Sequence, residues 1–387
     1  MSDISSHYED DEDDCFIDWT YEVFNDKYIM IKKLGKGSYC SVWLAYNYID
    51  NNFIALKVYN RCDYKRGKKE LLVFDKLKSK KICNIVTYNK SFDFEHEDYD
   101  DEQSIGSGKS NSIFLCISME LCGYSLYDIV KLFRDNDDLK PPTDYYYNIV
   151  KNSITILNDI HSKGFVHSDI KPENILLKKP SYETFLLMNK IKSFKTGKFI
   201  KITNKNINDF VKKLKGELKN KINTKIEDEY KYIFDGTYET VICDMGTTVI
   251  PNDSAPYKKY TIYYRAPETI LKLNFNHTYD YWSFGCTLYE ILTETILFNA
   301  DDDLELLYLF MCKLGPIPSS LIDESEYRKK FFTSSDKRIR GYKKIVFESI
   351  YERFERIKKQ DEKMEQLIKV MISCLSYEAD KRVLDIN

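Results

Sequence analysis

Between residues 28 and 59, apolar and polar positions alternate with a period of two residues, which is typical of β-strands. The stretch YIMIKKLGKGSYCSVWLAYN carries this pattern on both sides of a glycine turn and predicts two antiparallel strands. FIALKVYN predicts a further strand directly after them, and IFLCISMELCG predicts a buried strand that runs into Gly123. The chain up to about residue 119 is therefore predicted to be mainly β.

Other segments follow the helical period of 3.6 residues. Helices are predicted for GKKELLVFDKLKS, for SLYDIVKLF and for YYYNIVKNSITILNDIHSKG, which ends on Gly164 as helices commonly do. YDYWSFGCTLYEIL predicts a strongly apolar helix that suits the middle of a large lobe. NDFVKKLKGELKNKI places Phe210, Leu214, Leu218 and Ile222 four residues apart and predicts an amphipathic helix with a lysine-rich back. Together the patterns predict an α+β fold.

Three polar segments interrupt these patterns. Residues 1 to about 20 predict a solvated acidic tail, with a specific docking motif as the alternative. Residues 93 to 112 are polar and contain glycine and serine, which predicts a solvent-exposed hairpin or a disordered loop. Residues 178 to 240 form a lysine-rich insertion with two open interpretations: a solvated variable insertion with one helix packed on the body, or an RNA-binding or localisation patch. The acidic run of the tail comprises Glu9, Asp10, Asp11, Glu12, Asp13 and Asp14.

Length and composition narrow the class of protein. A chain of 387 residues is long enough for two lobes or domains, and its formal net charge of -3 favours neither nucleic acid nor membrane as a partner. The ten cysteines lie scattered without CxxC spacing, which indicates reduced thiols and not a disulfide framework or a zinc site. No apolar run reaches the roughly 18 residues of a membrane span, and the N-terminus does not resemble a signal peptide. We expect a soluble monomer in the cytoplasm or nucleus.

The stretch HSDIKPENILL concentrates the candidate chemistry. Asp169 can orient an acceptor hydroxyl and take its proton, Lys171 can neutralise a moving phosphoryl group, and Asn174 can help to hold Mg²⁺. These groups suit the transfer of a phosphoryl group from a nucleotide to a hydroxyl. The alternative interpretation is an ordinary loop before a buried Ile-Leu-Leu strand.

Residues of the predicted strands and of the first helix suit a nucleotide. Gly35 and Gly37 let backbone amides approach phosphates without a Cβ in the way. Ala55 and Lys57 form an AxK pattern whose lysine would reach the α- and β-phosphates, and a lysine on the buried side of a strand needs a partner. Glu70 is the candidate partner, with a surface glutamate as the alternative.

Two further segments complete this picture. VICDMG supplies Asp244 after a β-rich run, and we expect this carboxylate to chelate Mg²⁺. Met119 would lie at the back of a nucleotide pocket, where the backbone of residues 120 to 122 is free to bind adenine. Asp280, near the start of the apolar helix, is expected to anchor the backbone of the HSDIKPEN stretch, the candidate catalytic loop.

The order of these motifs over residues 28 to 387 resembles that of a eukaryotic-type protein kinase, and the lysine after the catalytic aspartate resembles the serine/threonine version. Within that superfamily the chain resembles the SR-protein kinases of the CMGC group. The residues behind this likeness are VFNDKY, Cys40-Ser41, HSDIKPEN without an arginine before the aspartate, the long insertion, and YRKKFFT. DMG departs from the usual DFG by one apolar exchange.

The resemblance implies a bilobal protein-kinase fold, with a small mainly β lobe at about 28 to 119 and a large mainly α lobe at about 123 to 387. It implies ATP and Mg²⁺ as cofactors, with Asp169 and Lys171 as catalytic residues and Asn174 and Asp244 as metal ligands. The implied nucleotide contacts are Leu34, Gly35, Lys36, Gly37, Ser38, Tyr39, Cys40, Ser41, Val42, Ala55, Lys57, Glu70, Met119, Glu120, Cys122 and Leu176.

Further expectations concern the residues around the HSDIKPEN stretch and the segment that follows Asp244. Thr261 should hydrogen-bond Asp169 and Lys171, Glu268 should form a buried ion pair with Arg382, and Arg265 should also join an ion pair. Ser168 stands where kinases that need activation-loop phosphorylation usually carry an arginine, and a neutral hydroxyl cannot pair with a dianion. We therefore expect activity without loop phosphorylation.

The resemblance also implies basic, Arg/Ser-rich protein substrates, for which an acidic groove would be needed. Its candidate residues are Asp301, Asp302, Asp303, Glu305, Asp323, Glu324 and Glu326, with plain surface charge as the alternative. Arg265 fits a kinase of the proline-tolerant group, so Ser-Pro substrates are a second alternative. Two other functions remain: a pseudokinase scaffold that does no chemistry, and a kinase whose basic insertion tethers RNA.

Overall fold

The structure is a computed structural model that describes residues 17–386, except 98–110, 137–138, 195–200, 220–221, 237, 251–260, 335–336, 343, 351–353 and 355–360. The described chain divides into two units. The small unit comprises the chain up to Leu71, Thr87–Leu121 and Phe185–Asn223, and the large unit comprises Leu72–Val86, Cys122–Thr184 and the chain from Thr224 onward. The small unit is mainly an antiparallel sheet and the large unit is mainly helical, as the predicted α+β fold requires.

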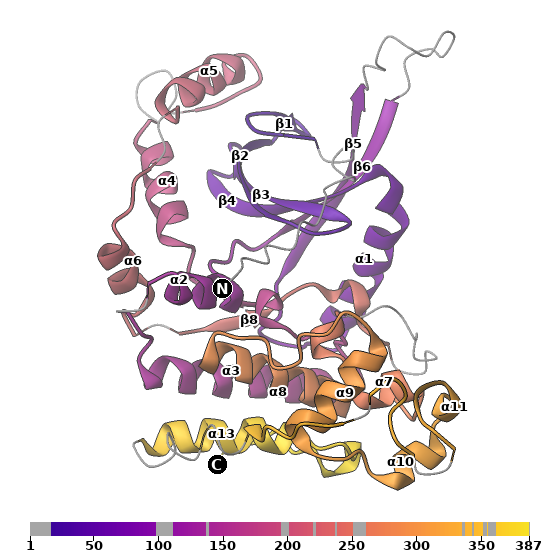
Figure 1. Ribbon diagram of the computed structural model, residues 1–387. Coiled ribbons are helices and arrows are strands. Elements are labelled where there is room, and N and C mark those ends of the chain that lie inside the picture. The colour runs from indigo at the N-terminus through magenta and orange to yellow at the C-terminus, as the bar shows by residue number, and fades with distance from the viewer. Residues whose placement is uncertain are drawn as a thin grey trace. The chain divides into compact units, whose positions relative to one another are not determined.

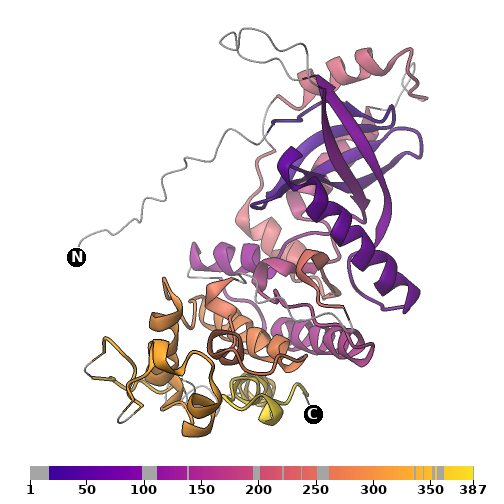
Figure 2. The ribbon, with the colours of Figure 1, turned by 90° about the vertical axis from the view of Figure 1, so that its right-hand side faces the viewer.

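A six-stranded antiparallel sheet in the order β1-β2-β3-β4-β6-β5 is the frame of the small unit (Figure 1). Its strands are β1 (Val23–Phe24), β2 (Tyr28–Lys36), β3 (Cys40–Asn47), β4 (Asn52–Tyr59), β5 (Tyr88–Glu97) and β6 (Asn111–Met119). The predicted strands around the glycine turn are confirmed. β5 and β6 form the long ribbon seen from the side in Figure 2, which confirms the hairpin on both flanks of residues 98–110; those residues lie outside the described chain.

The two faces of this sheet carry separate apolar cores. Because side chains alternate along a strand, Trp43 and Ala45 point to one face of β3 and Leu44 and Tyr46 to the other. Trp19 is only 2% exposed and belongs to the first core, where its ring meets those of Phe24, Phe94 and Phe114 edge-on. The predicted solvated tail is therefore wrong for residues 17–20, because the apolar residues after the acidic run are needed to close this face. The acidic run itself lies outside the described residues.

Helices of the lysine-rich insertion cover the second face. α4 (Tyr182–Ser193) and α5 (Ile207–Glu217) bury Ile191, Phe210 and Leu214 against β2 and β3. The amphipathic helix predicted around Phe210 is confirmed, although it ends at Glu217. The prediction of one packed helix is wrong, because α4 packs beside it and α6 (Ile226–Ile233) follows in the large unit. The boundaries differ from the prediction as well: the described residues of 185–223, predicted as part of the large lobe, belong to the small unit.

The large unit contains most of the helices. They are the end of α1 (Tyr64–Ser79), α2 (Leu126–Arg134), α3 (Thr143–Ser162), α6, α7 (Pro267–Leu271), α8 (Thr278–Thr293), α9 (Asp303–Leu314), α10 (Ser319–Glu324), α11 (Arg328–Phe331) and α13 (Glu362–Cys374). α8 is buried along nearly its whole length, as its apolar sequence predicts. It approaches α13 so closely that a Cβ on Gly285 would lie 2.9 Å from the Cys374 side chain.

Helix α6 closes the other end of the insertion onto the large unit. The Phe234 ring, just after α6, packs against Phe133 of α2 and Tyr145 of α3, and the Tyr124 hydroxyl donates a hydrogen bond to Glu229. A short hairpin of β7 (Ile175–Leu177) and β8 (Thr240–Ile242) flanks the insertion in the chain.

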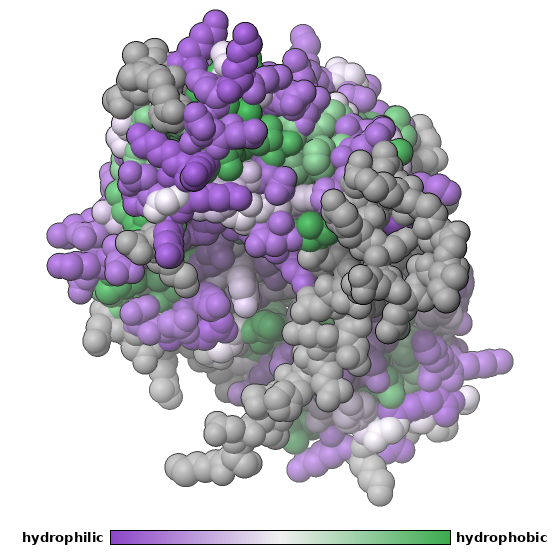
Figure 3. All heavy atoms as spheres, turned by 90° about the horizontal axis from the view of Figure 1, so that it is seen from above, coloured by the Kyte–Doolittle hydropathy of each residue, from purple (hydrophilic) through white to green (hydrophobic). Residues whose placement is uncertain are grey.

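The surface is mainly polar, because the apolar residues are mostly buried in the cores described above. Seen from above, the described surface is mostly hydrophilic, with small apolar areas between hydrophilic side chains (Figure 3). The cysteines of the described chain are all free thiols, as predicted. Within the described residues, no helix has both the length and the apolarity that a membrane crossing requires.

Candidate active site

The small unit brings Lys57 and Glu70 together as predicted. Both carboxylate oxygens of Glu70 lie 2.9 Å from Lys57 Nζ, and the two side chains are 1% and 7% exposed respectively. The hydroxyl of Tyr59, two residues after Lys57 on the same face of β4, donates a hydrogen bond to Glu70. A buried charge pair needs such additional hydrogen bonds, because desolvation otherwise cancels the attraction.

Close packing of α1 on the sheet makes this pair possible. A Cβ on Gly67 would lie 2.5 Å from Leu115 and 2.7 Å from Tyr59, so only glycine lets the helix approach this closely. Glu70 follows three residues later on the same helix.

The glycine turn between β2 and β3 is open. A Cβ on Gly35 would meet no atom within 4 Å, and one on Gly37 only ordinary contacts with Cys40. Packing within the described chain therefore does not explain these glycines, whereas close approach of a phosphate would. Around them, Leu34, Lys36, Ser38 and Tyr39 are exposed.

Two members of the predicted nucleotide set point elsewhere. Ser41 accepts a hydrogen bond from the indole nitrogen of Trp43 at 2.9 Å on the face opposite Val42, so its side chain cannot meet the same ligand as Lys57. The Tyr39 ring lies 3.9 Å under the Arg66 guanidinium. We therefore correct the prediction for Ser41: its side chain does not contact the nucleotide, and any contact comes from its backbone.

The segment expected to meet adenine begins where β6 ends. Met119 pairs with Ala55 across the sheet, so these two predicted nucleotide contacts are neighbours on β6 and β4. The Glu120 amide donates to Thr87 O at 3.0 Å and the Glu120 carboxylate accepts from Thr87 N at 2.6 Å. The side chain of Glu120 is thereby turned to this structural bond and away from any ligand of the segment's backbone. In the large unit, Leu176 is half-buried on β7.

The large unit assembles the HSDIKPEN residues around one carboxylate. Asp169 accepts hydrogen bonds from Thr261 Oγ1 at 2.9 Å and from Asn174 Nδ2 at 3.1 Å, and Lys171 Nζ lies 3.0 Å from its second oxygen. Lys171 also donates to Thr261 Oγ1 at 3.0 Å. Both predicted bonds of Thr261 are confirmed, although it lies about ninety residues after the loop in sequence.

Charge around Lys171 keeps its amine protonated. Burial alone would lower the pKa of Lys171, but the carboxylates of Asp169, Glu173 and Asp244 raise it above its ordinary value. Asp244 is thus one of the carboxylates whose charge acts on the Lys171 amine. The large unit thus concentrates negative charge beside a permanent cation.

Asp280 anchors the backbone of this loop as predicted. Its two oxygens accept the amides of His167 and Ser168, each at 2.8 Å, and one of them also lies 2.7 Å from His161 Nε2. Ser168 has a left-handed backbone with φ of 66°, which is uncommon for a residue with a side chain. The carboxylate therefore stabilises a turn that costs energy and that directs Asp169.

The segment that carries Asp244 is attached to the same loop. Ser168 Oγ donates to Thr247 O at 2.8 Å, Thr247 Oγ1 donates to His167 O at 3.3 Å, and His167 Nε2 lies 2.9 Å from Cys243 O. The Cys243 amide donates to Asn174 O at 2.9 Å. Asp244 is thus bracketed on both sides by residues that bond to the loop.

The residues present fit a magnesium ion that also binds phosphate. The Asn174 amide nitrogen bonds to Asp169, which leaves its oxygen as the atom offered to a cation. Within the described chain no three His, Cys, Asp or Glu side chains cluster as a complete metal site. Mg²⁺ commonly takes one or two protein oxygens and completes its shell with phosphates and water, so Asn174 and Asp244 suffice.

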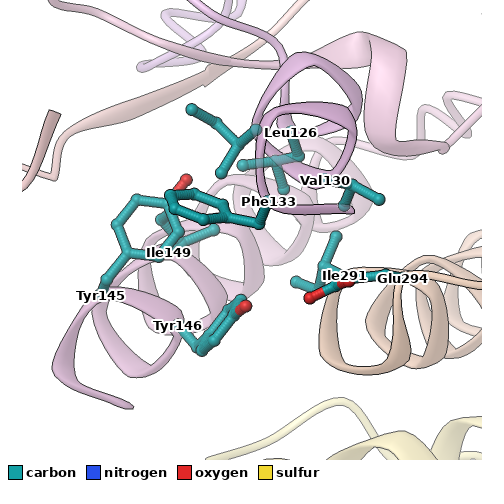
Figure 4. Close-up of a pocket in the computed structure, with 9 residues that line it drawn as sticks. Leu126, Val130, Phe133, Tyr145, Tyr146, Ile149, Ile291 and Glu294 are labelled. Atoms are coloured by element: carbon teal, nitrogen blue, oxygen red, sulfur yellow. The ribbon is translucent and has the colours of Figure 1, made fainter. Parts of the chain in front are cut away.

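A small cavity elsewhere in the large unit is not part of this site. It lies between α2, α3 and the end of α8, lined mainly by apolar side chains such as Val130, Phe133 and Ile149 (Figure 4). Its volume of about 10 Å³ would hold one water-sized sphere, which is far too small for a nucleotide.

Comparison with known proteins decides the family. A model of the protein kinase domain matches residues 28–215 and 233–384. The chain belongs to the protein kinase family. Its fold is the bilobal kinase fold, and its relatives include kinases of the predicted CMGC group.

Three curated kinases illustrate the likeness. The dual specificity protein kinase CLK4 of Mus musculus is 25% identical over 331 residues, which cover 84% of this chain and 57% of that protein. The serine/threonine-protein kinase AFC1 of Arabidopsis thaliana is 25% identical over 84% of this chain and 60% of that protein. The dual specificity protein kinase lkh1 of Schizosaccharomyces pombe is 24% identical over 86% and 40%. This kinase chain spans about half the length of the curated relatives it matches.

Three contributors to the kinase site were missed in the sequence. Tyr59 could have been found, because alternation along β4 puts it on the face of Lys57. Gly67 carried a weaker signal, since a glycine inside a helical pattern indicates close packing. Thr247 carried none, because its contribution depends on a backbone carbonyl.

Removing Glu70 should destabilise this kinase strongly. In Glu70→Ala the Lys57 ammonium stays buried without its partner, and we expect the free energy of unfolding to fall by about 3–5 kcal/mol in urea denaturation. The matched Lys57→Met/Glu70→Leu double variant removes both charges and should recover most of that loss. A Glu70→Ala protein as stable as the wild type would contradict the buried pair.

Proposed function

We propose that this chain is an ATP-dependent serine/threonine protein kinase. The observation that carries this is the arrangement of Asp169, Lys171, Thr261 and Asn174, in which a carboxylate is held beside a cation and a candidate metal ligand. The pairing of Lys57 with Glu70 supports it from the small unit. We propose that both sets act on one nucleotide.

In the proposed reaction, each residue acts on one atom. Asp169 orients the acceptor hydroxyl and takes its proton, while Lys171 offsets the charge of the phosphoryl group in transit. Lys57, held by Glu70, binds the α- and β-phosphates. Mg²⁺, when bound by Asn174 and Asp244, neutralises charge on the phosphate oxygens.

The rival function is a pseudokinase that binds but does no chemistry. Such proteins commonly lack the lysine, the catalytic aspartate or the metal aspartate, whereas Lys57, Asp169 and Asp244 are all present. The bonds that hold Asp169 would have no use in a scaffold. We therefore favour catalysis.

Several contacts support activity without loop phosphorylation. The Ser168 hydroxyl bonds directly to Thr247 O, and Val166 and Val249 exchange two backbone hydrogen bonds at 3.2 and 2.8 Å. A phosphate held by an arginine would stabilise the same stretch through an added charge pair. Here neutral bonds already connect the loop to the Asp244 segment.

For the substrate we propose basic, Arg/Ser-rich proteins. Part of the predicted acidic set is neutralised within the chain: Asp303 pairs with Arg265, Asp323 with Lys337 and Arg328, and Glu326 with Lys272. Asp302 caps α9 by accepting the amides of Leu304 and Glu305 at 2.8 Å. Asp301 and Glu305, at the same helix start, are the carboxylates best placed to meet a basic peptide.

RNA tethering by the insertion is less well supported. Lys192, Lys213 and Lys215 lie over the rings of Phe53, Phe194 and Tyr21, at 5.9, 5.3 and 5.6 Å from the ring centres. Lysines used in this way stabilise packing inside the small unit. We therefore give the described lysine-rich face a structural role.

Asp169→Ala should abolish most of the transfer. Loss of a general base lowers turnover by roughly 10²- to 10⁴-fold, while the affinity for ATP should stay nearly unchanged. Transfer of radiolabelled phosphate and nucleotide calorimetry measure the two quantities. Turnover equal to that of the wild type would remove Asp169 from the mechanism.

Phosphatase treatment should leave activity nearly intact. Because neutral bonds secure the Asp244 segment, we expect treated kinase to retain at least about half of its turnover, and Ser168→Ala to lose about two- to tenfold. Ser162→Ala removes an exposed hydroxyl that donates a hydrogen bond to Asp159 O, and this change should have no effect. Near-complete loss of activity on dephosphorylation would refute this proposal.

Neutralising the start of α9 should weaken basic substrates selectively. We expect Asp301→Asn/Glu305→Gln to raise the KM for an arginine/serine-repeat peptide about three- to tenfold at low salt, with less effect on a Ser-Pro peptide. Glu362→Gln, on α13, is the matched control. Equal changes for both peptides would assign the carboxylates to plain surface charge.

A further inference from the structure

The insertion supplies more than half of a core in the small unit. Seven of its twelve buried residues come from the insertion, four from β2 and β3, and one from the residue just after β3. The insertion contributes Leu187, Ile191, Phe194, Ile202, Ile207, Phe210 and Leu214. The strands contribute Ile29, Ile31, Leu44 and Tyr46, and Tyr48 directly follows β3. Without α4 and α5, this face of the sheet would expose a large apolar area to water.

This core lies on the face of the sheet that carries Lys57. Residues directly opposite each other on antiparallel strands share a face, and Val42 is paired with Lys57, Leu44 with Ala55 and Tyr46 with Phe53. The face therefore runs without interruption from the residues proposed to meet ATP to those covered by α4 and α5. A change of packing under Tyr46 would be transmitted along the same strands.

The core also reaches the segment proposed to bind adenine. Leu121, between Glu120 and Cys122, is packed against the insertion core. The bonds of Glu120 to Thr87 fix the preceding residue on its other side. The backbone offered to a purine is thus supported by the insertion through one apolar side chain.

Specific contacts fix how the insertion helices are seated. The Tyr48 hydroxyl donates to Asn204 Oδ1 at 3.1 Å, and the rings of Tyr46 and Phe210 pack with centres 6.2 Å apart. Lys215 also lies over the ring of Tyr21, 5.6 Å from its centre. Because these contacts define how the helices pack, they can stabilise one conformation of the sheet. A loosely packed insertion could not do this.

We propose that α4 and α5 of the insertion are a positioning element for nucleotide binding. By supporting Leu121 and the sheet face of Lys57 and Ala55, they set the affinity for a purine nucleotide without touching it. This inference rests on the proposed kinase function for the identity of the ligand. Its test therefore measures nucleotide binding directly as well as phosphoryl transfer.

The test uses substitutions inside this core, made in the full chain. Phe210→Ala removes a fully buried ring and Phe210→Leu conserves most of its volume, whereas Ile49→Ala changes an exposed apolar residue of the same unit. Calorimetry with the ATP analogue AMP-PNP and Mg²⁺ measures the Kd, and peptide phosphorylation measures both KM values and kcat. All assays run well below the Tm of each variant.

We expect Phe210→Ala to raise the Kd for AMP-PNP and the KM for ATP about tenfold, with kcat at saturating ATP and the peptide KM within about twofold of the wild type. Phe210→Leu should recover most of the affinity, and Ile49→Ala should match the wild type. A folded Phe210→Ala protein with a lower Tm but unchanged Kd would overturn the proposal, because the insertion would then only stabilise the fold.

A milder substitution covers the case in which Phe210→Ala does not fold. Leu218 is half-buried against the same core, and Leu218→Ala should raise the Kd about threefold. Wild-type affinity in that variant would also overturn the proposal. If the wild-type chain binds AMP-PNP but transfers no phosphate, the kinase function fails while the Kd values still decide this inference.

Discussion

The proposed chemistry of the large unit depends on the hydrogen bonds that the buried carboxylate of Asp280 accepts from the backbone. This carboxylate accepts the amides of His167 and Ser168 at 2.8 Å and lies 2.7 Å from His161 Nε2, so its charge is compensated by three nitrogens. Those amides belong to a left-handed turn that would otherwise be strained and unsatisfied. The position of Asp169 follows from this anchor, because it is the next residue in the chain.

From this turn, hydrogen bonds extend to the other candidate ligands. Asn174 bonds back to Asp169, and its carbonyl accepts the amide of Cys243 next to Asp244. Ser168 secures the far side of Asp244 through Thr247. Two segments about seventy residues apart in sequence therefore share one hydrogen-bonded frame, so the insertion between them can be long without disturbing the site.

The sequence predicted most of the elements, because periodicity reports on local structure. The side-chain pairs were predicted from the likeness of the motifs to those of protein kinases, since two of the three join residues 92 and 114 positions apart. Lys57 with Glu70, Thr261 with Asp169 and Glu268 with Arg382 all meet as expected, the last with Arg382 Nη1 and Nη2 at 2.6 and 2.7 Å from the two carboxylate oxygens. The pattern of α5 showed that it has an apolar face but not which surface covers that face. For the same reason, the burial of Trp19 beside the acidic run could not be predicted.

The central proposal is that Lys57 of the small unit and Asn174, Asp169 and Asp244 of the large unit serve one nucleotide. A crystal structure of the chain with AMP-PNP and Mg²⁺ tests it most directly. The account predicts a magnesium ion about 2.0–2.1 Å from Asn174 Oδ1 and an Asp244 oxygen, Lys57 Nζ within hydrogen-bond distance of the α- or β-phosphate, and Asp169 facing the γ-phosphate. A bound nucleotide with any of these four side chains turned away from it would contradict the account.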